Sequence, residues 1–219
     1  MKKLLLGFVM VAVGLLLISP AASAYPVSVG DKIILTQGTG GANNGGSFNV
    51  DLVGDSAGSL FSTFCLERNE YFNPGVAVYV GSISDSVYNG GYSGGNPDPI
   101  SSATAYLYYR WATGLIANTA ANANDLQLAI WSLEGEMGAN PSLTTTTGAD
   151  AFISSAANAQ GFYGVQVMNL YDSYDPTTGY YNPKQSQLIY DPVQTPEPAT
   201  MLLFGLGLLG LAGIRRKMK

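Results

Sequence analysis

Two residues of this 219-residue chain carry side chains that could react with each other: Cys65, which is its only cysteine, and Gln127. A cysteine thiolate is a nucleophile, and the side-chain carbonyl of a glutamine is an acyl group that it can attack. Loss of ammonia would leave a buried thioester, which could then acylate an amine or a hydroxyl. A single cysteine suits such a bond, because a second thiol could exchange with it.

Each of these residues lies in a short apolar motif. Cys65 follows an aromatic residue in "TFCLE", and Gln127 begins the segment "QLAIW", which ends at Trp131. In this order and at this separation the motifs resemble those of the thioester domains of bacterial surface proteins, where a strand cysteine is joined to a glutamine in a Gln-x-Ala-Ile-Trp segment. The resemblance covers residues 61–135. It implies a Cys65–Gln127 thioester that attaches the domain covalently to a nucleophile on a surface or matrix protein or polysaccharide.

Other residues near the two motifs could support this chemistry. Phe64, Tyr71 and Trp131 are aromatic side chains that could shield the bond from water, and Glu67 or Glu134 could assist proton transfer. Their proximity in sequence does not fix their geometry.

Both residues also have ordinary structural interpretations. A free cysteine in an apolar strand is often a small buried hydrophobe, and an odd cysteine in an exported protein can pair between molecules. Gln127 stands three residues after Asn124, which is the spacing of a capping box at a helix N-terminus. Trp131 lies one helical turn beyond Gln127 and would then serve packing alone.

Several other kinds of site have little support in the sequence. The chain contains no histidine, which excludes histidine-based triads and histidine zinc sites, and one thiol cannot build a cysteine-rich metal site. We expect no metal, no cofactor and no enzymatic activity. A pair of acids for glycoside hydrolysis would draw on four candidates chosen by residue type only, Glu67, Glu70, Glu134 and Glu136.

Residues 1–24 have the pattern of a secretory signal peptide. Two lysines precede the apolar run "LLLGFVMVAVGLLLI", and the small-x-small pair Ala22 and Ala24 follows it. An uncleaved membrane anchor is the alternative, but the apolar run is short and the cleavage pattern comes directly after it. The pattern predicts export and processing by signal peptidase.

The C-terminal residues 193–219 combine three parts in a fixed order, namely Pro196-Glu197-Pro198, an apolar stretch at 199–214, and a basic tail that begins with Arg215 and Arg216. This combination closely resembles the PEP-CTERM sorting signal. The resemblance implies recognition by an exosortase, removal of the tail, and release or anchoring outside the cytoplasmic membrane of a bacterium that makes exopolysaccharide. A plain C-terminal membrane anchor is the alternative.

The apolar stretch 199–214 is short for a membrane span. A helix of this length measures about 24 Å, against roughly 30 Å of bilayer hydrocarbon. We expect it to hold the protein in the membrane transiently, before processing, with the basic tail on the cytoplasmic side.

The region between these ends is acidic and of the size of one domain. Residues 25–195 carry four basic and fourteen acidic side chains, a net charge of −10. Such a surface repels phosphate backbones and argues against nucleic-acid binding. We assign residues 25–192 to one extracellular domain.

The periodicity of apolar residues predicts strands first and helices afterwards. Period-two stretches bounded by Gly, Asn or Pro occupy 27–36, 46–54, 59–67 and 76–88, and strand patterns return at 164–172 and 185–191. A four-residue recurrence predicts a helix at 102–113, apolar residues at helical spacing predict a second that starts at Asn124 and Asp125 and includes Met137, and a third, shorter helix is expected at 150–160. The expected fold class is α+β: a β-sandwich or barrel with inserted helices, flanked by the signal peptide and the short transmembrane helix.

Two functions of different classes follow. The first is an exported protein of the cell envelope, cell surface or extracellular matrix whose domain forms the Cys65–Gln127 thioester. The second is a non-reactive structural or carbohydrate-binding component of an exopolysaccharide or biofilm matrix. Methylamine separates them, because only a thioester adds the amine.

Overall fold

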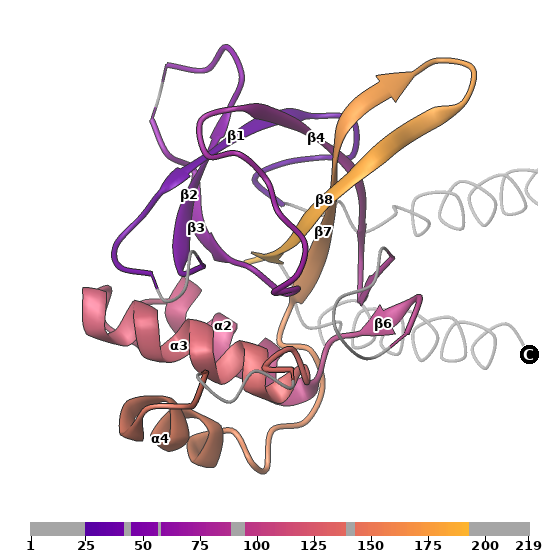
Figure 1. Cartoon of the computed structure of the whole chain (residues 1–219). Helices are drawn as coiled ribbons and strands as arrows, with labels where there is room; N and C mark the ends of the chain where they lie inside the picture. The colour runs from indigo at the N-terminus through magenta and orange to yellow at the C-terminus, as the bar shows by residue number, and fades with distance from the viewer. Residues whose placement is uncertain (1–24, 42–44, 57, 89–94, 139–142, 193–219) are drawn as a thin grey trace, which may run out of the picture.

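The computed structural model describes residues 25–41, 45–56, 58–88, 95–138 and 143–192. Within them a six-stranded sheet is covered at one end by helices that precede its last two strands in the chain (Figure 1). The sheet is antiparallel throughout, with strand order β3-β2-β1-β4-β7-β8. Its strands are β1 (Lys32–Gln37), β2 (Ser47–Leu52), β3 (Phe61–Phe64), β4 (Ala77–Ser84), β7 (Val165–Asp175) and β8 (Gly179–Tyr190). The fold is sheet-rich with a few helices, and so is consistent with the predicted sandwich-like class.

The sheet curls until its two edge strands, β3 and β8, meet. Just beyond β3, Cys65 forms an isolated antiparallel bridge with Gln187 of β8, and the amide of Leu66 donates to the carbonyl of Ser186 at 3.1 Å. The hydroxyl of Thr63 adds a hydrogen bond to the carbonyl of Leu188 at 2.5 Å. The curl therefore encloses the apolar faces of the strands around one core.

Alternation of side chains explains why these strands bury one face. Ile33 and Leu35 of β1 and Phe48 and Val50 of β2 are fully or almost fully buried, while the residues between them are more exposed or polar. This period-two pattern places alternate residues on the core side of a strand. The predicted strands are confirmed in position, with differences at their ends.

The largest of these differences occur at turns. The first strand begins at Lys32 rather than at residue 27, because Gly30 adopts a φ of +96° in the turn before it. The predicted stretch 76–88 divides at Asp85 into β4 and the short strand β5 (Ser86–Val87). That short strand pairs with β6 (Asp98–Pro99), which the sequence did not predict.

Three helices lie between β6 and β7: α2 (Ser102–Ala112), α3 (Ala120–Leu133) and α4 (Thr147–Ser155). The first agrees with the prediction, and the Ser101 hydroxyl caps it by accepting from the amide of Thr104 at 3.1 Å. The carboxylate of Glu134, just after α3, accepts from both the amide and the hydroxyl of Ser101. The C-terminus of α3 is thereby tied to the N-terminus of α2.

The start predicted for the second helix is wrong. Thr119, rather than Asn124, is the N-cap of α3, and its hydroxyl accepts from the amide of Asn122 at 3.2 Å. The segment "AANAN" continues the helix because alanine has the highest helix propensity. Asn124 lies inside the helix and accepts from the amide of Gly41 at 2.6 Å. The capping-box interpretation of Gln127 is therefore excluded.

Helix α4 also begins earlier than predicted, at Thr147 instead of residue 150, and it ends at Ser155 instead of residue 160. Thr146 caps it and also donates its hydroxyl hydrogen to the carboxylate of Asp125 on α3 at 2.5 Å. The polar contact holds α4 against the helix that carries Gln127.

The position of the α3 cap can be tested by substitution. Thr119→Ala is expected to lower the free energy of unfolding by about 1 kcal/mol, because it removes the acceptor of an otherwise unpaired helix amide. Urea unfolding followed by circular dichroism measures the change. Thr144→Ala, an exposed threonine outside the helices, is the matched control and should change stability by less than about 0.5 kcal/mol. Equal stability of the two variants would contradict the assigned cap.

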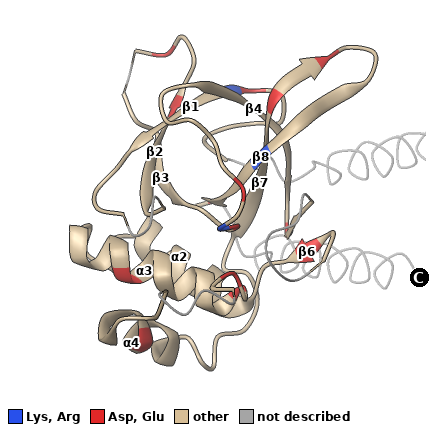
Figure 2. Cartoon of the chain, in the orientation of Figure 1, with Lys and Arg blue, Asp and Glu red and all other residues tan. Residues whose placement is uncertain are grey.

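The predicted signal peptide at 1–24 and the predicted membrane helix at 199–214 lie outside the described residues. Among the residues that are described, no helix has both the length and the apolar character needed to cross a membrane. Acidic side chains are spread over strands, helices and loops, and basic ones are few (Figure 2).

Candidate functional site

The structure brings Cys65 and Gln127 together. Cys65 directly follows the last residue of β3, the strand that pairs with β2, and it bridges to Gln187 of β8; Gln127 lies on α3. Both residues are 0% exposed. The site is therefore built where the helical layer meets the closing edge of the sheet (Figure 1).

Two hydrogen bonds hold the Gln127 amide against the backbone of Cys65. The Gln127 Nε2 donates to the carbonyl oxygen of Cys65 at 2.9 Å, and the amide of Cys65 donates to Gln127 Oε1 at 3.2 Å. This pairing fixes the orientation of the glutamine side chain and keeps its carbonyl group beside the cysteine.

A second amide also donates to the same carbonyl oxygen. The backbone N–H of Gly46, just before β2, lies 2.9 Å from Gln127 Oε1. Two N–H donors on one carbonyl oxygen polarise the carbonyl and would stabilise negative charge that develops on the oxygen during nucleophilic attack. Gly46 has a φ of +120°, and a Cβ there would collide with the Cα of Gly41. Glycine is thus required at this donor.

The thiol of Cys65 is protonated and shielded from solvent. The pKa of Cys65 is raised to about 12, chiefly by burial; a hydrogen bond from Gln187 lowers it and the nearby Glu67 carboxyl raises it. In that bond the Gln187 Nε2 donates to Cys65 Sγ at 3.5 Å. Any attack by this sulfur requires loss of its proton within the site, because bulk base does not reach it.

The aromatic residues named from the sequence take different positions. Phe64 is buried, and its ring meets that of Trp111 edge to face at 5.0 Å, so it packs toward α2. Trp131 is buried one turn beyond Gln127. Tyr71 is 72% exposed and does not cover the pair.

Gly45 links Trp131 to Gln127. A Cβ built on Gly45 would lie 2.5 Å from Cη2 of Trp131 and 3.1 Å from Cγ of Gln127. The absence of a side chain therefore lets the indole ring and the glutamine pack closely against the backbone of residue 45. Trp131 and Gly45 together form a wall beside the Cys65–Gln127 pair.

The two carboxyl groups named as supporting groups, Glu67 and Glu134, have different hydrogen-bond partners. Glu67 is buried, its Oε2 accepts from the amide of Ser186 at 2.8 Å, and its Oε1 has no hydrogen-bond partner among the described residues. Burial, together with the charges of Glu70 and Glu136, raises its pKa well above the ordinary value. Glu67 is close enough to affect the Cys65 thiol electrostatically. Glu134 instead bonds Ser101, as described above.

Three of the four acids considered for glycoside hydrolysis surround very little space, and Glu70 does not line it. Glu67, Glu134 and Glu136 line, with Asp98, a cavity of about 10 Å³. This volume holds at most one water molecule and no sugar ring. Glu136 accepts from the backbone amide of Arg68 at 3.0 Å, which is a structural contact. Among the described residues, no group of acidic or cysteine side chains could hold a metal ion.

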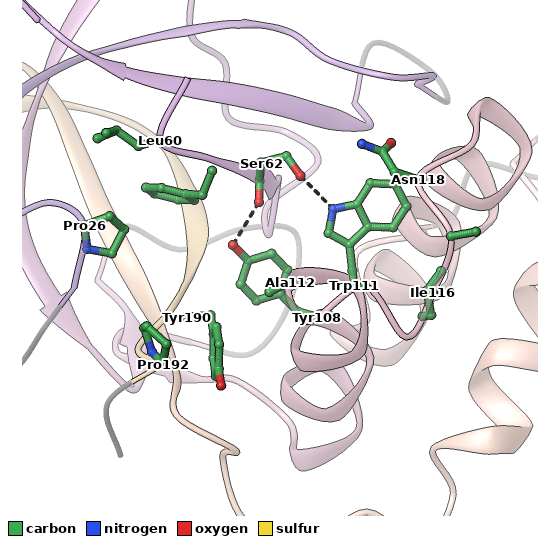
Figure 3. Close-up of a pocket in the computed structure, with 13 residues that line it drawn as sticks. Pro26, Leu60, Ser62, Tyr108, Trp111, Ala112, Ile116, Asn118, Tyr190 and Pro192 are labelled. Carbon is green, nitrogen blue, oxygen red and sulfur yellow. Dashed lines mark hydrogen bonds between the residues drawn. The ribbon is translucent and has the colours of Figure 1, made fainter. Parts of the chain in front are cut away.

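A pocket of about 480 Å³, the Ser62 pocket, lies between α2 and the chain ends of the domain (Figure 3). Its lining includes Pro26, Tyr108, Trp111 and Tyr190. The Trp111 indole N–H donates to the Ser62 hydroxyl at 2.7 Å, and the Tyr108 hydroxyl donates to the Ser62 carbonyl at 3.0 Å. The aromatic rings are therefore held in place by polar contacts within the protein.

A second pocket, of about 280 Å³, reaches the wall beside the Cys65–Gln127 pair. We call it the Trp131 pocket. Its lining includes Gly45, Phe48, Arg68, Tyr71, Phe72 and Trp131. Neither this pocket nor the contributions of Gly46 and Gln187 were predicted from the sequence. The glycine-rich segment "GGANNGG", which ends at Gly46, was the only local signal in the sequence near that residue.

Comparison with protein families identifies one motif. Residues 194–217 match the family described as the PEP-CTERM protein-sorting motif, and this range contains Pro196, Glu197, Pro198, Arg215 and Arg216. The motif implies an exported protein that exosortase sorts to the cell envelope or surface. No curated protein matched the chain, and no solved structure did. The extracellular domain is thus assigned to no family, and the resemblance to thioester domains gains no support from these comparisons.

Proposed function

We propose that the exported domain forms a thioester between Cys65 and Gln127 and uses it for covalent attachment to a nucleophile on a surface or matrix partner. The observation that carries this proposal is the double hydrogen bond between the Gln127 side-chain amide and the Cys65 backbone inside a fully buried site. The second N–H from Gly46 adds a donor at the oxygen where charge would develop.

The bond-forming step needs no further reactant. Cys65 Sγ attacks Gln127 Cδ, a carbon–sulfur bond forms, the carbon–nitrogen bond breaks, and the thiol proton leaves with the amide nitrogen as ammonia. The high pKa of the thiol means that this proton must be transferred inside the site. The unpartnered Oε1 of Glu67 makes this carboxyl a candidate for the transfer.

In the attachment step the Cys65 sulfur, which was the nucleophile, becomes the leaving group. A nucleophile attacks the same carbonyl carbon, the carbon–sulfur bond breaks, and Cys65 regains a proton as a free thiol. Complete burial of the pair protects the thioester from hydrolysis until a partner reaches it. One molecule of protein reacts once, so the domain acts as a covalent binder and not as an enzyme.

Intact mass of the purified mature protein tests the proposal. The mass is expected to be lower than calculated by one ammonia, with no titratable thiol, and methylamine should add once and release one thiol. Cys65→Ala is the control, and it should show its full calculated mass and no adduct.

A full calculated mass with a free thiol, and glutamine at position 127 in the peptide map, would contradict the proposal. Glutamate at position 127 would instead show that the bond had formed and hydrolysed.

The Ser62 pocket favours the second candidate function, a non-reactive component of the extracellular matrix that binds polysaccharide or protein noncovalently. Its aromatic lining and its volume of about 480 Å³ suit a ligand site. This function predicts that Cys65→Ala still binds matrix material. Covalent attachment instead predicts that the wild type stays bound to matrix material after denaturing washes and that Cys65→Ala does not.

A further inference from the structure

The Trp131 pocket is a hollow in the described surface that shares two lining residues, Gly45 and Trp131, with the wall beside the buried pair. Gly45 and Trp131 line the pocket, and both pack closely at Gln127 as described above. Because Cys65 and Gln127 are fully buried, this wall stands between a nucleophile held in the pocket and the Gln127 side chain. A displacement of the Trp131 ring would open it.

The charge of the lining selects among nucleophiles. Arg68 is the only charged residue that lines the pocket, and the described lining includes no carboxylate. The Arg68 Nη1 lies 3.5 Å from the carbonyl oxygen of Met137, which anchors the guanidinium at this site. A lysine ammonium would meet this positive charge with no compensating acid, whereas a neutral hydroxyl would meet a hydrogen-bond donor.

The aromatic rings of the lining point to the same ligand chemistry. Phe48 and Phe72 meet edge to face at 4.8 Å, and Tyr71 presents a largely exposed ring at the same pocket. A sugar ring has an apolar C–H face that packs on such rings and a rim of hydroxyls that hydrogen bonds to polar side chains. The volume of about 280 Å³ is small for a ligand site and suits one sugar unit of a longer chain.

The indole N–H of Trp131 adds an independent observation. It is buried and has no hydrogen-bond acceptor among the described residues. A buried donor without a partner costs free energy, and this cost is relieved when an acceptor arrives. A ligand hydroxyl oxygen is an acceptor of the required kind.

We infer that the Trp131 pocket is the acceptor site of the domain and that it presents a saccharide hydroxyl, rather than a lysine amine, to the thioester; this inference rests on the proposed function. The hydroxyl oxygen bonds to Gln127 Cδ, the carbon–sulfur bond breaks, and the hydroxyl proton passes to Cys65 Sγ. The products are an ester to the saccharide and a free thiol.

The test uses the mature protein and four probes: a neutral glucan oligosaccharide, a uronate oligosaccharide, Nα-acetyl-lysine amide and methylamine. Intact mass follows each adduct, thiol titration follows release of Cys65, and hydroxylamine cleaves esters but leaves amides. We expect an ester with at least one of the two oligosaccharides, formed faster than the lysine adduct at equal concentration. The two oligosaccharides separate a neutral from an acidic acceptor.

Three variants locate the reaction at the pocket. Tyr71→Ala is expected to slow saccharide ester formation about three- to tenfold and to leave the methylamine rate unchanged, because the exposed ring contacts only the larger ligand. Arg68→Gln is expected to raise the rate with the lysine probe about fivefold. Arg110→Gln is the matched control, since Arg110 lies on α2 over the ring of Tyr106 and does not line the pocket.

The outcomes distinguish the two proposals. Absence of any methylamine adduct overturns the proposed function and this inference with it. A normal methylamine adduct without saccharide ester, or a lysine adduct that forms faster than the ester, overturns the inference alone. An ester whose rate is the same in Tyr71→Ala also overturns it, because the saccharide would then enter elsewhere.

Discussion

Replacing Gln127 with leucine is expected to abolish covalent attachment and, in the Cys65→Ala background, to lower the free energy of unfolding by about 4 kcal/mol. Leucine fills a similar volume but offers no polar atom. The amides of Gly46 and Cys65 and the carbonyl of Cys65 would lose the partner that they have in the structure. Each buried group left without a partner costs about 1–3 kcal/mol.

The choice of Cys65→Ala as the reference separates hydrogen bonding from covalent chemistry. That variant retains the Gln127 amide and cannot form a thioester. The difference in free energy of unfolding between it and the double variant Cys65→Ala/Gln127→Leu therefore measures the amide contacts alone. Urea unfolding followed by tryptophan fluorescence gives both stabilities. A difference below about 1 kcal/mol would contradict the hydrogen-bond network and remove the structural basis of the proposed function.

Gln127→Glu in the wild-type background is the matched variant for the chemistry. Its carboxyl group has nearly the shape of the amide, and in the protonated form it can accept from Gly46 and Cys65 and donate to the Cys65 carbonyl. We expect it to fold at mildly acidic pH, to show its calculated mass, and to react with no methylamine. Folding without reaction would show that the amide is needed for bond formation and not only for stability.

The local patterns of the sequence predicted most elements of the fold. The four-residue recurrence of Leu107 and Trp111 predicted α2, and the structure places its N-cap at Ser101, directly before the predicted start at residue 102. The start of α3 was missed because Asn124 and Thr119 are both good N-cap residues. The alanines between them favour Thr119 as the N-cap, because their high helix propensity extends the helix toward the N-terminus.

The contacts across the closing edge of the sheet were beyond sequence patterns. Cys65 and Gln187 lie 122 residues apart, and nothing in either segment specifies that β3 and β8 meet. The motifs singled out Cys65 and Gln127, which the structure brings together, and the bond between them stays a prediction. Gly46 was missed because a backbone donor has no side-chain signature, and its positive φ is known only from the fold.

The acidic cluster beside the site is expected to make the protein less stable as pH rises from about 5 to 8. Burial, followed by the charge of Glu136, raises the pKa of Glu70 from 4.5 to about 7, and Lys184 lowers it. Burial also raises the pKa of Glu67 well above its ordinary value. A carboxyl with a higher pKa in the folded state binds more protons folded than unfolded. Its contribution is therefore present below pH 4.5 and is lost as pH rises toward the folded pKa.

Glu67→Gln is expected to remove the largest part of this pH dependence. The amide can still accept from the Ser186 amide, and it has no charge to form on unfolding, so the variant should gain stability over wild type by up to about 1.4 kcal/mol per pH unit above pH 5. Thermal melts between pH 5 and 8 measure the slope. Asp175→Asn is the acid-to-amide control, because hydrogen bonds from Thr177 and Thr178 lower the pKa of Asp175, below this window. Parallel pH profiles for wild type and Glu67→Gln would contradict the raised pKa of Glu67, because they would show that its carboxyl group ionises in the folded protein as it does in the unfolded chain.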